Sequence, residues 1–166
     1  MAETREATTD EIETLVGQLV ARHAGRRGAL LPVLHDLQER LGWLPDAAVP
    51  AIAHGLNLSR AEVHGVITFY HDFRRAPPAR HIVKLCRAEA CQARGGRRIE
   101  AAAAARLGVS MGEARADGQV ALEPVYCLGL CAVGPVALVD GRPYARLDQA
   151  RLEVIAKEIG LGEDGA

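Results

Sequence analysis

The stretch Ile82-Val-Lys-Leu-Cys-Arg-Ala-Glu-Ala-Cys91 sets a C-x4-C pair directly after a short apolar run. The stretch Val125-Tyr-Cys-Leu-Gly-Leu-Cys131 repeats the arrangement with a C-x3-C pair. The sequence holds only these 4 cysteines, so no thiol is left over. Each pair can bring two thiolates to one point. The chain therefore supplies four soft ligands, the complement that a tetrahedral zinc ion or a [2Fe-2S] cluster requires.

Three kinds of site compete for these cysteines. Disulfides fit least, because the acidic, polar segment 1–11 lacks the apolar core of a signal peptide and cysteine-poor cytosolic chains rarely carry bridges. We accordingly expect a cytoplasmic protein. Structural zinc sites favour C-x2-C knuckles, which these pairs fit only at the margin. A [2Fe-2S] cluster is bulkier and needs wider loops, so the spacing favours the cluster and leaves zinc as an alternative.

The composition argues against nucleic acid or a membrane as a partner. The formal net charge is -1, with 20 basic and 21 acidic residues, so no global field would hold a polyanion or an anionic membrane. Aromatic residues make up only 4% of the chain, too few for the stacking surface that single-stranded nucleic acid requires. No segment approaches the apolar run needed to span a bilayer.

The front third of the chain predicts a bundle of four short helices. Thr8 and Glu11 form one capping box, and Ser59 and Glu62 form another, each before an apolar stripe at helical spacing. Asp46 is expected to cap the third helix. The expected helices cover residues 8–20, 30–41, 46–55 (ending at Gly55) and 59–70.

A proline-containing linker, residues 74–80, separates this bundle from a mixed second half. The patterns there predict, in order, a strand, a helix, a strand, a hairpin around Asp140-Gly141 and a last helix capped by Asp148. We therefore expect an α/β (α+β) protein with two domains. Residues 1–75 would form the helical bundle, which we expect to serve in docking, and residues 80–161 would form the domain with the cysteines. The expected elements of the second domain cover residues 82–85, 95–107, 120–125, 136–145 and 148–159.

Both cysteine pairs directly follow strands that can be neighbours in one sheet. Rigid strands would fix the start of each loop. The glycines Gly95, Gly96, Gly129 and Gly134 would let the backbone approach closely, and loop amides could point at the sulfurs. Arg87 directly follows Cys86, so we expect its charge to favour the reduced, more negative state of a cluster. Glu89 lies in the same loop.

The segment 51–64 also looks like a helix-turn-helix, which would suit an iron-sulfur regulator that binds DNA. Its second helix offers little beyond Arg60 and His64 for contacts with bases. Two antiparallel helices joined by a short turn are also a common part of an ordinary bundle. The DNA-binding interpretation remains an alternative.

The two cysteine pairs, in a small sheet behind a helical bundle, resemble the thioredoxin-like [2Fe-2S] subunit family of the complex I NADH-dehydrogenase module. Three segments, Leu85–Gln92, Gly65–Tyr70 and Val125–Ala132, most resemble the gamma subunit of NAD-dependent, molybdenum-containing formate dehydrogenase. The equivalent subunits of NADH dehydrogenases and NAD-reducing hydrogenases share this arrangement of cysteine pairs, sheet and helical bundle.

This resemblance implies a non-catalytic electron-transfer subunit that exchanges single electrons with a flavin-bearing, NAD-binding subunit. A molybdenum-containing catalytic subunit would oxidise formate. The chain itself shows no G-x-G-x-x-G turn and no P-loop, so we expect no catalytic residue in it. The resemblance assigns one [2Fe-2S] cluster to Cys86, Cys91, Cys127 and Cys131, with the first two on one iron and the last two on the other.

Overall fold

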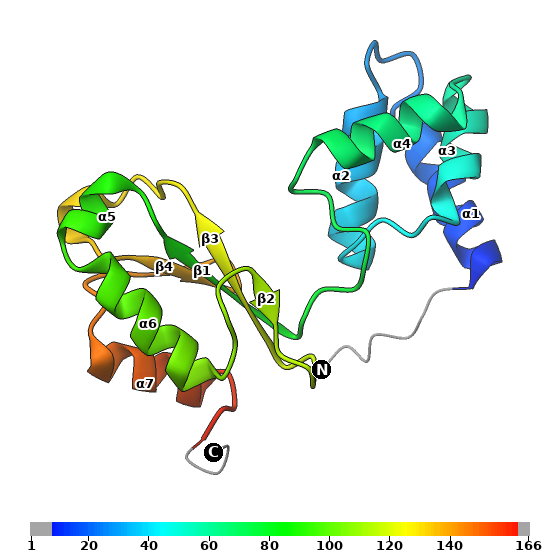
Figure 1. Cartoon of the computed structure of the whole chain (residues 1–166). Helices are drawn as coiled ribbons and strands as arrows, with labels where there is room; N and C mark the ends of the chain where they lie inside the picture. The colour runs from blue at the N-terminus through cyan, green and yellow to red at the C-terminus, as the bar shows by residue number, and fades with distance from the viewer. Residues whose placement is uncertain (1–7, 163–166) are drawn as a thin grey trace. The chain divides into compact units, whose positions relative to one another are not determined.

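A computed structural model describes residues 8–162 of the chain, which divides into two compact units, Met1–Pro77 and Pro78–Ala166. Within the described residues it has seven α-helices and one five-stranded mixed sheet, so the predicted α/β class is confirmed (Figure 1). No helix between residues 8 and 162 is both long enough and apolar enough to cross a bilayer.

The first unit is the expected set of four helices around one apolar core. Both predicted capping boxes are present: the amide of Thr8 donates to Glu11 Oε2 at 2.8 Å, and that of Ser59 to Glu62 Oε2 at 2.8 Å. Val16, within the first predicted helix, is almost fully buried in this core. The helices are α1 (Thr9–Arg22), α2 (Leu30–Leu41), α3 (Ala48–Leu56) and α4 (Arg60–Phe69).

Two details predicted for α3 were wrong. Asp46 does not cap it: the position before the helix is Ala47, while the carbonyls of Pro45 and Asp46 accept the first amides in a turn. The Asp46 carboxylate instead accepts a hydrogen bond from Arg75 at 3.2 Å. The helix also continues past Gly55, and a Cβ at that glycine would lie 3.0 Å from a methyl group of Val20. Gly55 therefore provides room for α1 rather than an end to α3.

The second unit is built on a sheet with strand order β2-β3-β1-β4-β5. Strand β1 pairs in parallel with β3, and every other pair is antiparallel. The parallel register sets Cys86, the last residue of β1, opposite Val125, the last residue of β3. The two loops that carry the cysteines therefore leave the sheet at the same edge. The strands are β1 (His81–Cys86), β2 (Glu113–Ala114), β3 (Val120–Val125), β4 (Ala137–Val139) and β5 (Arg142–Tyr144).

Helices α6 (Gly96–Leu107) and α7 (Gln149–Glu158) pack against each other, and their buried residues share one core with the sheet (Figure 1). As predicted, Asp148 caps α7 by accepting from the amide of Arg151 at 2.8 Å. Three short elements were not predicted, because none is long enough to show a hydrophobic period. They are β2, the helix α5 (Glu89–Ala93) and the 3-10 helix η1 (Cys131–Val133).

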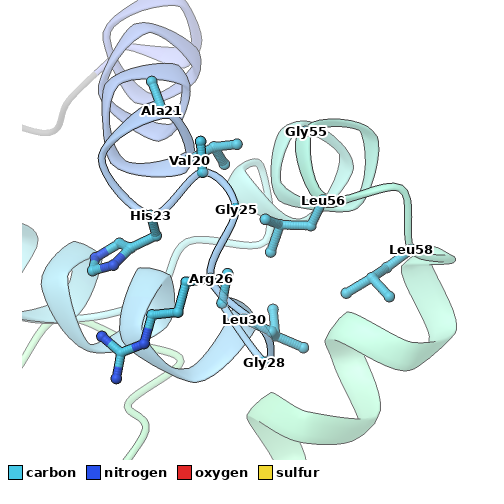
Figure 2. Close-up of a pocket in the computed structure, with 12 residues that line it drawn as sticks. Val20, Ala21, His23, Gly25, Arg26, Gly28, Leu30, Gly55, Leu56 and Leu58 are labelled. Carbon is cyan, nitrogen blue, oxygen red and sulfur yellow. The ribbon is translucent and has the colours of Figure 1, made fainter.

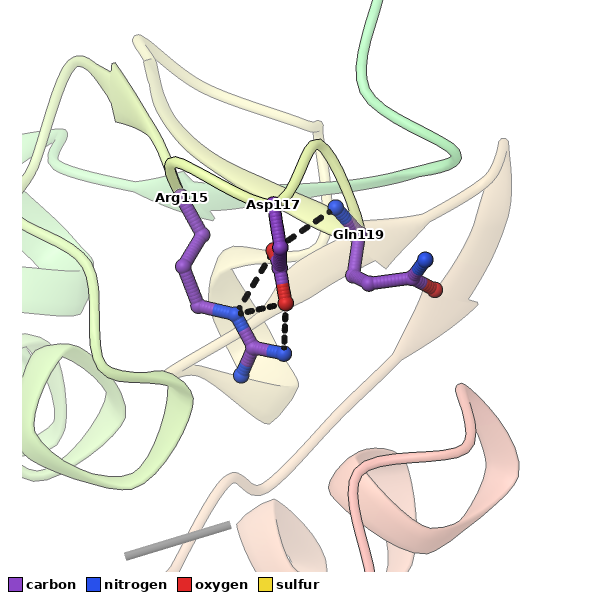
Figure 3. Close-up of polar contacts among 3 residues, drawn as sticks. All are labelled: Arg115, Asp117 and Gln119. Atoms are coloured by element: carbon purple, nitrogen blue, oxygen red, sulfur yellow. Dashed lines mark hydrogen bonds and ion pairs between the residues drawn. The ribbon is translucent and has the colours of Figure 1, made fainter.

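The turn between β2 and β3 is closed by side chains at the end of the sheet remote from the cysteines. Arg115 Nε donates to Asp117 Oδ1 at 2.9 Å, and the amide of Gln119 donates to the same oxygen at 3.0 Å (Figure 3). The hydrogen bond from Arg115, followed by that from the amide of Gln119, lowers the pKa of Asp117 to about 2. These hydrogen bonds stabilise the turn, and we assign it a structural role.

Replacing Asp117 by asparagine should lower the stability of the chain slightly at neutral pH and not at all in strong acid. The pKa of Asp117 falls from its ordinary 3.8 to about 2 in the folded chain. The ionised group therefore stabilises the fold above pH 3.8, and this contribution disappears as the pH falls through about 2. Denaturant midpoints of both chains at a series of pH values measure the difference. A difference that grows toward low pH would contradict the assignment.

Candidate metal centre

The four cysteines come together at one edge of the sheet, as their positions after strands predicted. Cys86 ends β1, and Cys91 lies in α5 in the loop that follows. Cys127 follows β3, and Cys131 begins η1. Because β1 and β3 are parallel neighbours that end side by side, both loops lie over the same edge.

The two pairs differ in their exposure to solvent. Cys86 and Cys91 are buried, at 5% and 1% exposure, whereas Cys127 and Cys131 are exposed. The Sγ atoms of Cys127 and Cys131 lie 3.9 Å apart. Two thiolates on one tetrahedral metal, with metal–sulfur bonds of about 2.3 Å, lie about 3.8 Å apart. The second pair therefore already has the spacing of two ligands on one metal.

Backbone amides surround the sulfurs. The amide of Gly129 donates to Cys127 Sγ at 3.4 Å, and Cys127 itself has a left-handed backbone with φ of 80°. Burial acts to raise the pKa of Cys86, but hydrogen bonds to its sulfur outweigh burial and leave that pKa lowered. The donors are the amide of Ala88, the thiol of Cys91 and the amides of Cys127 and Leu128.

The second thiol of each pair resists ionisation. Burial, followed by the thiol of Cys86, raises the pKa of Cys91. The thiol of Cys127 raises the pKa of Cys131. Two neighbouring thiolates repel each other, and a bound metal would remove that repulsion by its positive charge. The electrostatics of the site therefore favour four thiolates only together with a cation.

Close packing fixes the buried pair. A Cβ at Gly96, the first residue of α6, would lie only 2.8 Å from the carbonyl oxygen of Cys91. A Cβ at Gly134 would lie 3.2 Å from Cys91 Sγ. Gly96 and Gly134 are thus needed for close approach, as predicted. The prediction was wrong for Gly129, where a Cβ would meet nothing within 4 Å, and for Gly95, where it would meet only Arg98 at 3.7 Å. Around the thiols lies a small apolar cluster that is separate from the main core of the unit and includes Cys86, Cys91 and Val136.

Two arginines accompany the first pair. Arg87 is not a free charge: its Nε lies 3.0 Å from Glu100 Oε2, so a carboxylate offsets its expected effect on the site. Arg94 was missed by the sequence analysis. Its Nη1 donates to the carbonyl of Ala132, in the second cysteine segment, at 3.0 Å. No local sequence pattern predicts the contact between Arg94 and Ala132, because these residues lie far apart in the chain.

The helical unit has a cavity of about 460 Å³ that is a weaker candidate for chemistry (Figure 2). Val20, Leu30, Leu56 and Leu58 surround it, and His23 is one of its few polar side chains. His23 Nε2 is already paired with Asp36 Oδ2 at 2.9 Å. The cysteine edge of the sheet therefore remains the candidate site.

Comparison with known families agrees with this geometry. Residues 16–160 match the thioredoxin-like [2Fe-2S] ferredoxin family, which covers both units of the chain. The chain belongs to this family. The family implies a [2Fe-2S] cluster, and the donor set fits one: two thiol pairs, amides directed at the sulfurs and apolar surroundings.

Relatives within the thioredoxin-like [2Fe-2S] ferredoxin family include two NADH-quinone oxidoreductase subunits E. The one from Pseudomonas aeruginosa is 37% identical over 114 residues, which is 69% of each chain. The one from Escherichia coli is 36% identical over 121 residues, or 73% of each chain. A crystal structure of an NAD+-reducing [NiFe]-hydrogenase matches 78% of this chain with a TM-score of 0.67 and 28% identity. The match covers only 22% of that hydrogenase chain.

Within residues 8–162, no group of three or more His, Cys, Asp or Glu side chains lies close enough together to hold a single metal ion. The thiols instead lie as two pairs. His81, the histidine nearest in sequence to Cys86, already has a partner: its Nδ1 lies 2.7 Å from Asp140 Oδ2.

Proposed function

We propose that this chain is an electron-transfer subunit of an NAD-linked oxidoreductase complex. It would hold one [2Fe-2S] cluster through Cys86, Cys91, Cys127 and Cys131, with one pair on each iron. The observation that carries this proposal is the convergence of two thiol pairs at the joint end of two parallel strands, in a chain of this family. As part of the same proposal, the subunit works in the cytoplasm, where its four free thiols stay reduced and available for iron.

The residues of the site divide the work of holding the cluster. When bound, the cluster accepts and releases one electron at a time. Cys86 and Cys91 hold their side of the site away from water, in apolar surroundings. Cys127 and Cys131 lie at the surface, next to the 69% exposed ring of Tyr126, where a partner can approach closely. The amides directed at the sulfurs stabilise negative charge there.

For the parent complex, we propose an NAD-dependent formate dehydrogenase with a flavin-bearing subunit and a molybdenum-containing catalytic subunit. The segments Leu85–Gln92, Gly65–Tyr70 and Val125–Ala132 support this assignment. The names of the relatives support a second candidate, the equivalent subunit of an NADH dehydrogenase or of an NAD-reducing hydrogenase.

Affinity purification of the tagged, full-length chain from its native host would distinguish these complexes. We expect iron and acid-labile sulfide in equal amounts, bound flavin, molybdenum and formate-dependent reduction of NAD. Activity with hydrogen or a quinone in place of formate would favour the second candidate. A colourless chain with stoichiometric zinc would overturn the proposed cofactor site. Duplex DNA binding that weakens steeply with salt would instead favour the iron-sulfur regulator.

We also propose that the helical bundle, residues 1–75, is mainly a docking element for the flavin-bearing subunit. The end of α4 carries an unusual pair of exposed aromatic rings: Phe69 is 73% exposed and Tyr70 is 43% exposed. The two rings pack edge to face with centroids 5.1 Å apart. Exposed aromatic side chains are typical anchors of protein interfaces.

Replacing Phe69 by alanine should weaken co-purification of the flavin-bearing subunit by roughly tenfold or more, the effect expected at a central interface residue. Folding should not suffer, because the ring lies at the surface. The matched control is Val154→Ala on α7, which removes a side chain that is 51% exposed. Flavin content of the purified complex measures the effect. Equal flavin in both variants would remove the docking role of this aromatic pair.

A further inference from the structure

Arg94 touches both cysteine segments through hydrogen bonds. Its backbone amide donates to the carbonyl of Cys91 at 3.2 Å. Its Nη1 donates to the carbonyl of Ala132 at 3.0 Å. The first acceptor is a proposed ligand of one iron, and the second directly follows Cys131, a proposed ligand of the other. Arg94 therefore spans the site from the buried pair to the exposed pair.

The stem of the Arg94 side chain and the buried sulfur of Cys91 both lie close to Gly134. A Cβ at Gly134 would lie 3.2 Å from Cys91 Sγ and 3.6 Å from Arg94 Cδ. The sulfur and the Arg94 stem therefore border the same point on the backbone of Gly134. Glycine at this position, directly after η1, leaves room for both.

The guanidinium also completes η1. The amides of Val133 and Gly134 already donate to the carbonyls of Leu130 and Cys131. The carbonyl of Ala132 receives its hydrogen bond from Arg94. Carbonyl groups at the end of a helix need such donors, so Arg94 holds the short helix that begins at Cys131.

Arg87 and Arg94 differ in whether a carboxylate neutralises their positive charge. Arg87 forms an ion pair with Glu100, with Nε and Oε2 3.0 Å apart. Arg94 has no carboxylate partner within residues 8–162, and its hydrogen-bond acceptor is a neutral carbonyl. A positive charge beside the site favours the more negative, reduced state of a bound cluster. Of the two arginines, Arg94 is the one with its charge available for this.

We infer that Arg94 is a positioning residue that ties the two cysteine segments together and supplies the uncompensated positive charge beside the cluster. The second role, the effect of the charge on the cluster, rests on the proposed function. The first role, the tie, consists of the hydrogen bonds by which Arg94 joins the two cysteine segments, and it can be tested without a cluster.

The test compares Arg94→Gln, Arg94→Lys and the matched control Arg87→Gln in the full-length chain. In the cluster-loaded protein we expect Arg94→Gln to lose its cluster to a chelator about three to ten times faster, the factor for one exposed, charge-assisted hydrogen bond. The ratio of reduced to oxidised cluster at a fixed potential, followed by EPR, should fall as well. Arg94→Lys should restore that ratio, and Arg87→Gln should change it less.

In the metal-free chain, hydrogen exchange at the amides of Val133 and Gly134 should become faster in Arg94→Gln and stay unchanged in Arg87→Gln. If exchange becomes faster in Arg94→Gln but the wild-type chain binds no cluster, the contact between the two segments stands and the proposed function is overturned. Unchanged exchange and unchanged chelator kinetics in Arg94→Gln would overturn the tie. A ratio of reduced to oxidised cluster that falls equally in Arg94→Lys and Arg94→Gln would overturn the electrostatic role.

Discussion

Replacing Cys91 by serine should leave the purified chain with almost no iron and no visible absorption, the largest effect expected of any single substitution in this site. Its sulfur is one of the four proposed ligands, and it is only 1% exposed in an apolar cluster. A hydroxyl there is a poorer ligand for iron than a thiolate. Without iron it would also be a buried polar group, at a cost of about 1–3 kcal/mol when it lacks a hydrogen-bond partner.

Cys131→Ser is the matched variant, because Cys131 is a proposed ligand with an exposed side chain. It should also lose the cluster, but the metal-free chain should unfold at the same denaturant concentration as the wild type. Iron and sulfide analysis measures the first effect, and denaturant unfolding of the metal-free chains measures the second. Full iron and sulfide in Cys91→Ser would exclude Cys91 as a ligand.

The parts of this fold that could be predicted from the sequence are those set by local signals. The capping boxes at Thr8 and Ser59 predicted helix starts because their hydrogen bonds close within three residues. The turn Asp140-Gly141 predicted the hairpin for the same reason. Asp46 is not the cap: it lies in the turn before α3, and a distant residue, Arg75, binds its carboxylate. Local patterns cannot reveal such a partner.

The candidate site shows the same division. The spacing of the cysteines predicted the candidate ligands, and the apolar runs before them predicted the strands. The parallel pairing that sets Cys86 opposite Val125 joins segments far apart in sequence and follows from the fold. The contact from Arg94 to Ala132 depends on that pairing, so it could be seen only in the structure. The five-residue helix α5 was missed because it is too short to show a period.

Gly96→Ala should destabilise the second unit, although helix propensity alone predicts the opposite. Alanine is favoured over glycine inside a helix by about 1 kcal/mol, and Gly96 lies at the start of α6 without a positive φ. A Cβ there would lie 2.8 Å from the carbonyl oxygen and 3.0 Å from the carbonyl carbon of Cys91. Both are backbone atoms, which cannot rotate away as a flexible side chain does. Overpacking of this kind typically costs about 1–3 kcal/mol, which exceeds the gain in propensity.

The damage should reach the metal centre, because the atoms in the way belong to a proposed ligand. Relief of the clash would move α5 away from α6 and Cys91 with it, so we expect lower cluster occupancy as well as a lower unfolding midpoint. The matched control is Gly17→Ala in α1, where a Cβ would meet nothing within 4 Å. That variant should gain about 0.5–1 kcal/mol, the ordinary benefit of alanine within a helix.

Two signals separate the effects of these glycine variants. The single tryptophan, Trp43, lies in the helical unit, so its fluorescence follows the unit that contains Gly17. Visible absorption per chain follows the unit that contains Gly96. We expect Gly17→Ala to raise the fluorescence midpoint at full absorption, and Gly96→Ala to lower the absorption while the fluorescence midpoint stays the same. If Gly96→Ala instead kept full absorption and became more stable by circular dichroism, α5 would be free to move away from α6, and the close contact at Cys91 would have no role in holding the site.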